Sequence, residues 1–332
     1  MIWYYLLTAV PLALFIVYLL VMDSFKLTKW PTLISSIIGG MLMYLLSWLI
    51  CRIPAIGESK LLISIIEELS KGAILYMLIA RRKVGLLGDA TIYGSAIGAG
   101  FGLMSNCFHL HHLLDEGTLS GWHTVFLGCE AAVMHIGCTS LLAMVLMMVR
   151  QGKFGASTRI KALGTILAFL ITFLVHYVHA LEPIDPLILT ALLVAYFLVS
   201  KASLFRKDSR FVHNWLDEGI NNEIYLLGAV KRGEFSTTKT GEYMMTLKDS
   251  FDPETFFDMY CYIQNFLELS IAAKSNLILK EAGIPPMHDP SNKDRLAEMV
   301  ELRKRIGPTG EKALRPIVDR NQVNSWALNN LI

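Results

Sequence analysis

Charged residues are scarce in this chain of 332 residues. Asp, Glu, Lys and Arg make up 17% of it, whereas a soluble domain carries about 25%. The scarcity is confined to residues 1–200, because residues 201–332 have the composition of an ordinary soluble domain. The net charge is only +2, and no basic cluster is interleaved with aromatic residues. The sequence therefore argues against a nucleic-acid partner.

Cysteines are also few, and their spacing matches no cysteine site. The five thiols form no Cys-x-x-Cys pair, and three of them lie in apolar runs, where a thiol behaves as a small hydrophobic group. The sequence therefore supports neither a disulfide framework nor a cysteine-based zinc site. The first 22 residues are apolar but lack a basic start and a small-residue cleavage site, so we expect them to remain as a membrane span.

Long apolar runs dominate the first 200 residues. A helix needs about 20 mostly apolar residues to cross a bilayer. Seven stretches are candidates: 2–22, 31–50, 61–80, 90–112, 124–149, 160–181 and 185–200. The sequence therefore predicts an all-α, polytopic membrane bundle of about seven spans over residues 1–204, which contains the candidate site. Residues 205–332 show helical patterning at 253–283 and 291–306, so we expect a small soluble helical domain there.

Lys and Arg are unevenly distributed among the short loops, and this distribution sets the orientation of a membrane protein. They follow the third and seventh spans and occupy the loop between the fifth and sixth. The loops after the fourth and sixth spans contain acidic residues but no Lys or Arg, and only the loop with Arg52 and Lys60 blurs the pattern. The alternation predicts an N-terminus outside the membrane and a C-terminal domain in the cytoplasm.

Polar residues interrupt the predicted spans at a similar depth. An ionisable group at the centre of a span costs roughly 2.5–3.5 kcal/mol, so such groups usually face a protein interior and mark function. At 1.5 Å per residue, Glu67 lies about 9 Å into the third span. Asn106, His135 and His176 lie in the same half of the bilayer, with His135 somewhat deeper. Four helices thus place polar groups at one level, which predicts a shared site.

Two adjacent carboxylates, Glu67 and Glu68, are followed by Lys71 at spacings that permit ion pairs. If Lys71 holds one carboxylate ionised, the two can differ in protonation, and one can act as a base on water. In the fourth span, glycines recur every four residues and lead to Asn106, with His109 about one turn further on, and we expect both residues, like Lys71, to support the site. Small residues at this spacing let helices approach closely, so we expect Asn106 to face a neighbouring helix.

The motif Glu67-Glu68-x-x-Lys71 in an early span resembles the signature of the PrsW family of intramembrane proteases, relatives of the CAAX-prenyl endopeptidase group. The histidines of the third and fourth family motifs match His135 and His176. The resemblance implies hydrolysis of a peptide bond in or near the membrane. The implied partners are the lipid bilayer and a membrane-anchored protein substrate, such as an anti-sigma factor, in the inner membrane of a bacterium.

The resemblance also implies roles for the site residues. Glu67 or Glu68 would activate water, and His135 and His176 would stabilise the oxyanion or bind a metal, with His179 in support. A Zn²⁺ ion held by His135, His176 and Glu68 suits these ligand types, and a metal-free glutamate–histidine mechanism suits them equally.

The likeness covers roughly residues 60–182 and is incomplete in two motifs. Ser105 replaces the Glu of the second motif, and His179 and Ala180 replace the Tyr and Asn that end the fourth. A catalytically inactive scaffold of the same fold therefore stays an alternative. A transporter of protons or metal ions also contains intramembrane carboxylates and histidines, but the sequence shows no internal repeat typical of transporters. The oligomeric state stays open.

Overall fold

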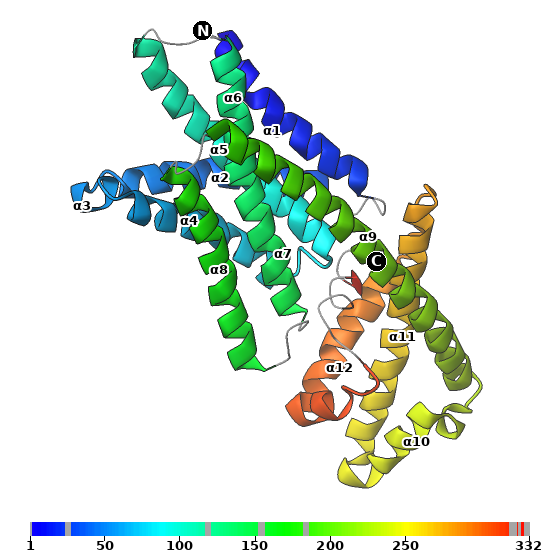
Figure 1. Cartoon of the computed structure of the whole chain (residues 1–332). Helices are drawn as coiled ribbons and strands as arrows, with labels where there is room; N and C mark the ends of the chain where they lie inside the picture. The colour runs from blue at the N-terminus through cyan, green and yellow to red at the C-terminus, as the bar shows by residue number, and fades with distance from the viewer. Residues whose placement is uncertain are drawn as a thin grey trace. The chain divides into compact units, whose positions relative to one another are not determined.

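The computed structural model describes residues 2–23, 28–116, 121–151, 157–181, 186–318, 324, 327 and 328. Every regular element among these residues is a helix (Figure 1), which confirms the prediction of an all-α chain. The chain divides into two compact units, Met1–Asp208 and Ser209–Ile332.

The first unit is a bundle of long helices. Its elements are α1 (Ile2–Met22), α2 (Trp30–Ile50), the short α3 (Pro54–Gly57), α4 (Lys60–Ala80), α5 (Leu87–Glu116), α6 (Gly121–Ala131), the π-helical turn η1 (Ala132–Gly137), α7 (Cys138–Arg150), α8 (Thr158–Ala180) and the first part of α9 (Pro186–Lys231). Helices correspond to all seven predicted spans. Residues 182–185, where the last predicted span begins, and the basic loop residue Lys153 lie outside the described residues.

Four helical stretches in the described residues have the length and hydropathy of a membrane span. They are Ile2–Val21, Trp30–Ile50, Thr124–Arg150 and Thr158–Ala180. The prediction of a helical membrane bundle is confirmed, while the number of seven spans stays a prediction. Helix α4 is not among the four, since Glu67, Glu68 and Lys71 lie in its middle.

Helix α4 buries the charged residues of its middle turns in the protein and exposes several of its apolar residues. The side chains of Glu68 and Lys71 are 1% and 0% exposed, whereas Leu69 and Tyr76 of the same helix are more than half exposed. A helix that met water on its outer face would show the reverse pattern. This inverted arrangement keeps the charges out of lipid and gives the bundle a polar interior.

Glycines of α5 let that helix approach its neighbours at backbone distance. A Cβ added at Gly94 would lie 2.6 Å from the Cβ of Ala143 in α7, and one at Gly98 would lie 2.6 Å from the carbonyl carbon of His135 in η1. Real Cβ atoms essentially never come within 3.0 Å of such atoms, so only glycine fits at either position. The glycine repeat therefore marks the close contact of α5 with α7 and η1, as the four-residue spacing predicted.

The second unit contains the rest of α9, η2 (Phe235–Thr237), α10 (Lys239–Thr246), η3 (Lys248–Ser250), α11 (Pro253–Glu281) and α12 (Ser291–Ala313). Asp252 caps α11 by accepting a hydrogen bond from the backbone N–H of Thr255 at 2.9 Å. Gly283, with φ +74°, follows the end of α11. Gly307, with φ 66°, interrupts α12 after residue 306, where the predicted helix 291–306 ends, and a further helical stretch continues to Ala313.

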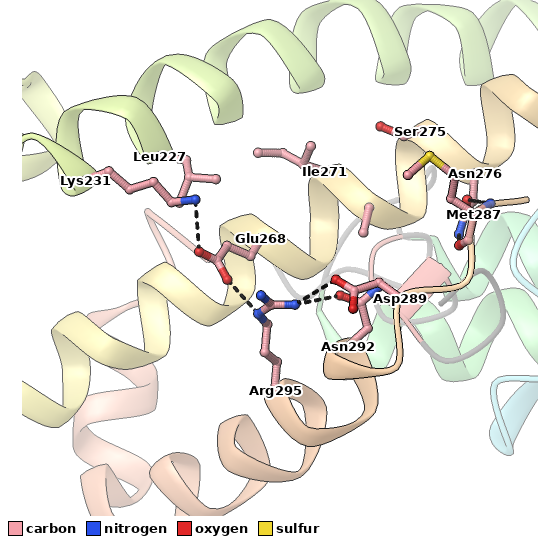
Figure 2. A pocket seen from close by; sticks show the side chains of 11 residues that line it. Leu227, Lys231, Glu268, Ile271, Ser275, Asn276, Met287, Asp289, Asn292 and Arg295 are labelled. Carbon is pink, nitrogen blue, oxygen red and sulfur yellow. Dashed lines mark hydrogen bonds and ion pairs between the residues drawn. The ribbon is translucent and has the colours of Figure 1, made fainter.

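A cavity of about 320 Å³ in the second unit is lined by residues of α9, α11 and α12 (Figure 2). Glu268 forms ion pairs with Lys231 at 3.4 Å and with Arg295 at 2.7 Å. The side-chain amide of Asn276 accepts a hydrogen bond from the backbone N–H of Met287 at 2.8 Å and donates one to its carbonyl oxygen at 3.1 Å. These contacts attach the segment between α11 and α12 to α11.

Candidate active site

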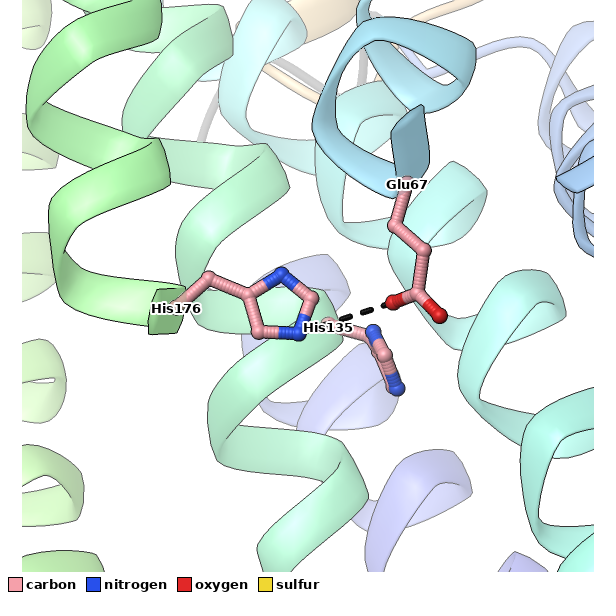
Figure 3. Close-up of side chains that lie close together, drawn as sticks. All are labelled: Glu67, His135 and His176. Carbon is pink, nitrogen blue, oxygen red and sulfur yellow. Dashed lines mark ion pairs between the residues drawn. The ribbon is translucent and has the colours of Figure 1, made fainter. Parts of the chain in front are cut away.

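Three predicted site residues from three separate helical elements meet inside the first unit (Figure 3). Glu67 comes from α4, His135 from η1 and His176 from α8, and one potential ligand atom of each lies within 4.8 Å of the other two. The imidazole rings of His135 and His176 are edge to face, with centroids 5.7 Å apart. Nε2 of His176 is 3.5 Å from Oε2 of Glu67. The fold thus brings together side chains that are far apart in the sequence.

His135 lies in the π-helical turn between α6 and α7. Such turns inside α-helices occur frequently at functional sites. The hydroxyl of Thr139 donates a hydrogen bond to the carbonyl oxygen of His135 at 2.7 Å, and Gly98 of α5 lies against the same carbonyl group. The phenyl ring of Phe101 packs against the imidazole, with centroids 5.0 Å apart. Contacts with α5 and within its own helix therefore set the position of His135.

Glu68 follows Glu67 in the sequence but has a different environment. Its Oε1 accepts a hydrogen bond from Nζ of Lys71 at 2.5 Å and lies 2.8 Å from Nδ1 of His176. Glu68 and Lys71 are both buried, so each balances the charge of the other. When Nδ1 of His176 carries the proton, it donates to Glu68 and leaves the lone pair of Nε2 on the side of Glu67. Glu68 thereby fixes the orientation of the His176 ring.

Exposure separates the two carboxylates further. The side chain of Glu67 is 16% exposed and that of His176 is 12% exposed, whereas Glu68 is 1% exposed. A water molecule or a substrate can therefore reach Glu67 and His176 more readily than Glu68.

One buried polar atom of this cluster, Nδ1 of His135, has no hydrogen-bond partner in the described part of the chain, and neither has Oε2 of the neighbouring Glu68. Buried polar atoms rarely stay unpaired, so Nδ1 of His135 needs a partner such as a water molecule or an ion. Imidazole nitrogens and a carboxylate oxygen are the ligands of catalytic zinc sites of the His₂Glu type, which leave one position open. The cluster fits a metal ion on these grounds. The carboxylate that meets both histidines is Glu67, although Glu68 was expected there from the sequence.

The supporting residues lie in different places. The side-chain amide of Asn106 donates to Oγ1 of Thr8 at 2.7 Å and to the carbonyl oxygen of Leu127 at 3.5 Å, so it joins α5 to α1 and α6. His109 is on the exposed surface of α5. The structure places neither residue in the group formed by Glu67 and the two histidines.

His179 faces Glu130, with Nε2 and Oε1 3.4 Å apart, and this pair connects α8 to α6. Sequence reasoning missed Glu130 as a partner because its position near a span end is typical of an interfacial residue. Phe101, which matches the Phe that begins the second family motif, contacts the imidazole of His135, and the centroid of its ring lies 5.0 Å from Nζ of Lys71. Sequence reasoning gave Phe101 no role in the site, although its place in that motif could have pointed to one.

One of the two departures from the family motifs has a contact between helices. Ala180 ends α8, and its carbonyl oxygen accepts a hydrogen bond from Nζ of Lys60 at 2.9 Å. This position therefore connects α8 to α4. Ser105 lies on α5 and is partly buried.

Comparison with known proteins identified one family. The sequence profile of the PrsW family intramembrane metalloproteases matches residues 6–203. The matched range includes Glu67, His135 and His176. A search of curated proteins gave no match, and a search of solved structures gave none either.

Proposed function

Because this chain belongs to the PrsW family of intramembrane metalloproteases, we propose that the cluster of Glu67, His135 and His176 is its catalytic centre. The family assignment and the apolar helices make the chain an integral membrane peptidase, whose substrate is a protein embedded in the same membrane. The observation that supports the proposed centre is the convergence of the three side chains within 4.8 Å from three helical elements.

Glu67, His135 and His176 would hold a Zn²⁺ ion. When bound, Zn²⁺ supplies the Lewis acidity that makes water a nucleophile at neutral pH. The protein contributes the geometry, since Gly98 and Thr139 fix the backbone of His135. It also contributes a dry surrounding, because the aromatic ring of Phe101 covers one side of His135.

Hydrolysis also needs a group that takes a proton from the attacking water and returns it to the departing amine. Glu67 has this role in our proposal: one of its carboxylate oxygens would hold the metal, and the other would take the proton. Its Oε2 faces His176, and its Oε1 makes no hydrogen bond within the described part of the chain. It is also the more exposed carboxylate of the pair.

Glu68 and Lys71 act as positioning residues. Glu68 contacts Nδ1 of His176, on the opposite side of the ring from Nε2. Carboxylates placed in this way orient metal-binding histidines, and their loss typically costs 10–100-fold in metal affinity or activity. Lys71 keeps Glu68 ionised in the bundle interior, where an unpaired carboxylate is costly.

The test combines metal content with proteolysis. Glu67→Gln, His135→Ala and His176→Ala should each remove stoichiometric zinc from the purified protein, measured by elemental analysis. The same variants should abolish cleavage of co-expressed single-span proteins without lowering membrane abundance. His109→Ala is the matched control, since His109 is exposed on α5, and it should behave as the parent chain.

The outcomes separate the mechanisms. Continued cleavage in all three variants would refute the placement of the catalytic centre. Full zinc content in an inactive Glu67→Gln variant would make Glu67 a proton acceptor only. Activity that survives complete removal of zinc would favour the metal-free glutamate–histidine mechanism.

A catalytically inactive scaffold is the second candidate, and the departures at Ser105 and Ala180 favour it. A scaffold binds a membrane-anchored partner but tolerates Glu67→Gln without any change of phenotype. Copurification of an uncut single-span protein with the parent chain, unchanged in that variant, would support the scaffold.

The proposed substrate is an anti-sigma factor or a similar membrane-anchored regulator in the bacterial inner membrane. Residues 205–332 form the proposed cytoplasmic domain, and the N-terminus lies outside. The support is the distribution of Lys and Arg among the loops. A reporter that works only in the cytoplasm, fused after Ile332, should be active, whereas a reporter active only outside the cytoplasm would invert the orientation.

A further inference from the structure

A second cavity, of about 510 Å³, lies among α4, α7 and α8 of the first unit. The last residues of two helices, Ala80 and Arg150, line it together with Thr158, the first residue of α8. The cluster of Glu67, His135 and His176 involves the same segments of chain but lies toward their other ends. The rise from His135 to Arg150 is roughly 20 Å at 1.5 Å per residue. The cavity is therefore separate from the proposed catalytic centre.

The walls of this cavity are mainly apolar. Ile79, Leu146 and Val149 are buried at its base, while Tyr76 and Ile166 line it with exposed side chains. Both α7 and α8 belong to stretches with the length and hydropathy of membrane spans. The volume falls in the range of small-molecule sites, roughly 300–1,000 Å³. Such a groove on spanning helices fits a hydrocarbon chain better than a water-soluble compound.

The polar end of the cavity is cationic. Arg150 and Lys161 line it, and none of its lining residues is Asp or Glu. Helix ends of membrane spans lie near the interface, at the level of lipid headgroups. The two cations therefore lie where the phosphate of a lipid would lie, and no acidic side chain lines the cavity with them.

We propose that this cavity binds an anionic phospholipid, with the phosphate between Arg150 and Lys161 and an acyl chain along Leu146 and Ile166. Basic pockets between membrane helices bind lipid headgroups of this kind. A free phosphate ion would use the cations but leave the apolar walls empty, so the lipid accounts for both features. Because the same helices hold the catalytic cluster, the bound lipid would brace them against one another.

The experiment uses the full chain, purified in a neutral detergent. The probes are phosphatidylglycerol and phosphatidylcholine with identical acyl chains, and native mass spectrometry measures the retained lipid. We expect retention of phosphatidylglycerol, and a loss of affinity of about fivefold for each cation removed in Arg150→Gln and Lys161→Gln. The matched control is the double variant Arg81→Gln with Arg159→Gln, which removes the same charge outside the cavity and should retain the lipid.

Two further variants distinguish a bound lipid from a free anion and from a general effect of the fold. Ala162→Trp, at an exposed lining position, should fill the groove and remove binding although both cations remain. Arg150→Lys with Lys161→Arg should retain the lipid, which would show that the charges act and not the fold alone. Excess inorganic phosphate should not displace the lipid.

Several results would overturn the proposal. One is equal retention of phosphatidylglycerol by the double variant Arg150→Gln with Lys161→Gln and by its control. Another is equal retention of phosphatidylcholine and phosphatidylglycerol by the parent chain. The others are displacement of the lipid by inorganic phosphate and unchanged lipid binding to Ala162→Trp. Lipid binding is measured without any protease assay, so the result tests the lipid site independently of the proposed catalytic function.

Discussion

Replacing Gly98 by Ala tests whether the close contact of α5 with η1 sets the geometry of the proposed catalytic cluster. The added Cβ would lie 2.6 Å from the carbonyl carbon of His135 and 2.7 Å from the Cα of Ile136. Carbon atoms pack at about 3.5–4.0 Å, so the two backbones must separate by roughly 1 Å. Since the obstructing atoms belong to the backbone, no change of side-chain rotamer can relieve the contact.

The expected effects differ in size for stability and activity. Inserting a methyl group into a packed interior costs about 1–3 kcal/mol, which lowers the free energy of unfolding without abolishing the fold. A displacement of about 1 Å at a reacting group can cost about 100-fold in rate. Because His135 moves with η1, Gly98→Ala should lose zinc affinity and nearly all cleavage while it still accumulates in the membrane.

The assay measures cleavage of a co-expressed single-span substrate, zinc content and chemical unfolding. Gly39→Ala is the matched control, because its added Cβ would meet Cδ1 of Ile74 at 2.8 Å, the flexible end of a side chain that can rotate away. Gly39→Ala should keep cleavage near the parent level. Parent-like cleavage by Gly98→Ala, or an equal loss in both variants, would refute the reasoning.

Substitutions at three other positions test two further interactions. Glu68→Gln and Lys71→Met should each lower the free energy of unfolding by about 3–5 kcal/mol, since each leaves one buried charge uncompensated. The double variant should lose less stability than the sum of the two single losses. Additive losses in a double-mutant cycle would contradict the pairing of Glu68 with Lys71. Asp252→Ala should lower the unfolding temperature, whereas Asp252→Asn keeps the cap. Hydrogen bonds from Thr255 lower the pKa of Asp252. The stabilisation of the fold by the Asp252 carboxylate is therefore complete at neutral pH and should disappear as the pH falls through that lowered pKa. Equal unfolding temperatures of the Ala and Asn variants would contradict the cap.

The helical bundle could be predicted because polar groups are costly in lipid, so membrane-spanning segments appear in the sequence as long apolar runs. Apolar runs gave the helices of the first unit, and the rarity of ionisable residues in such runs singled out Glu67, His135 and His176. The glycine repeat predicted a close helix contact because small residues at a fixed spacing are typical of helices that pack together within a membrane.

The sequence could not predict which of the two carboxylates, Glu67 or Glu68, lies with both histidines. Consecutive residues on an α-helix point about 100° apart, and the rotation of α4 in the bundle decides which of them meets the histidines. The π-helical turn at His135 has a similar origin, since it is held by Gly98 and Thr139 through tertiary and local contacts that leave no periodic pattern. Helix α9 continues to Lys231, past the predicted end of the last span, because no proline interrupts it after Pro186.

The contact between Glu68 and His176 has a consequence for the synthesis of the chain. These residues are 108 positions apart, so ribosomes working at about 5–20 residues per second make the histidine roughly 5–20 s after the glutamate. During that interval Lys71 can already neutralise Glu68, because both belong to one helical turn, but Glu67 lacks the imidazole of His176 beside it. With the proposed catalytic centre, the nascent protein cannot cut a membrane protein until α8 has been inserted, so the order of translation itself would delay the onset of proteolysis.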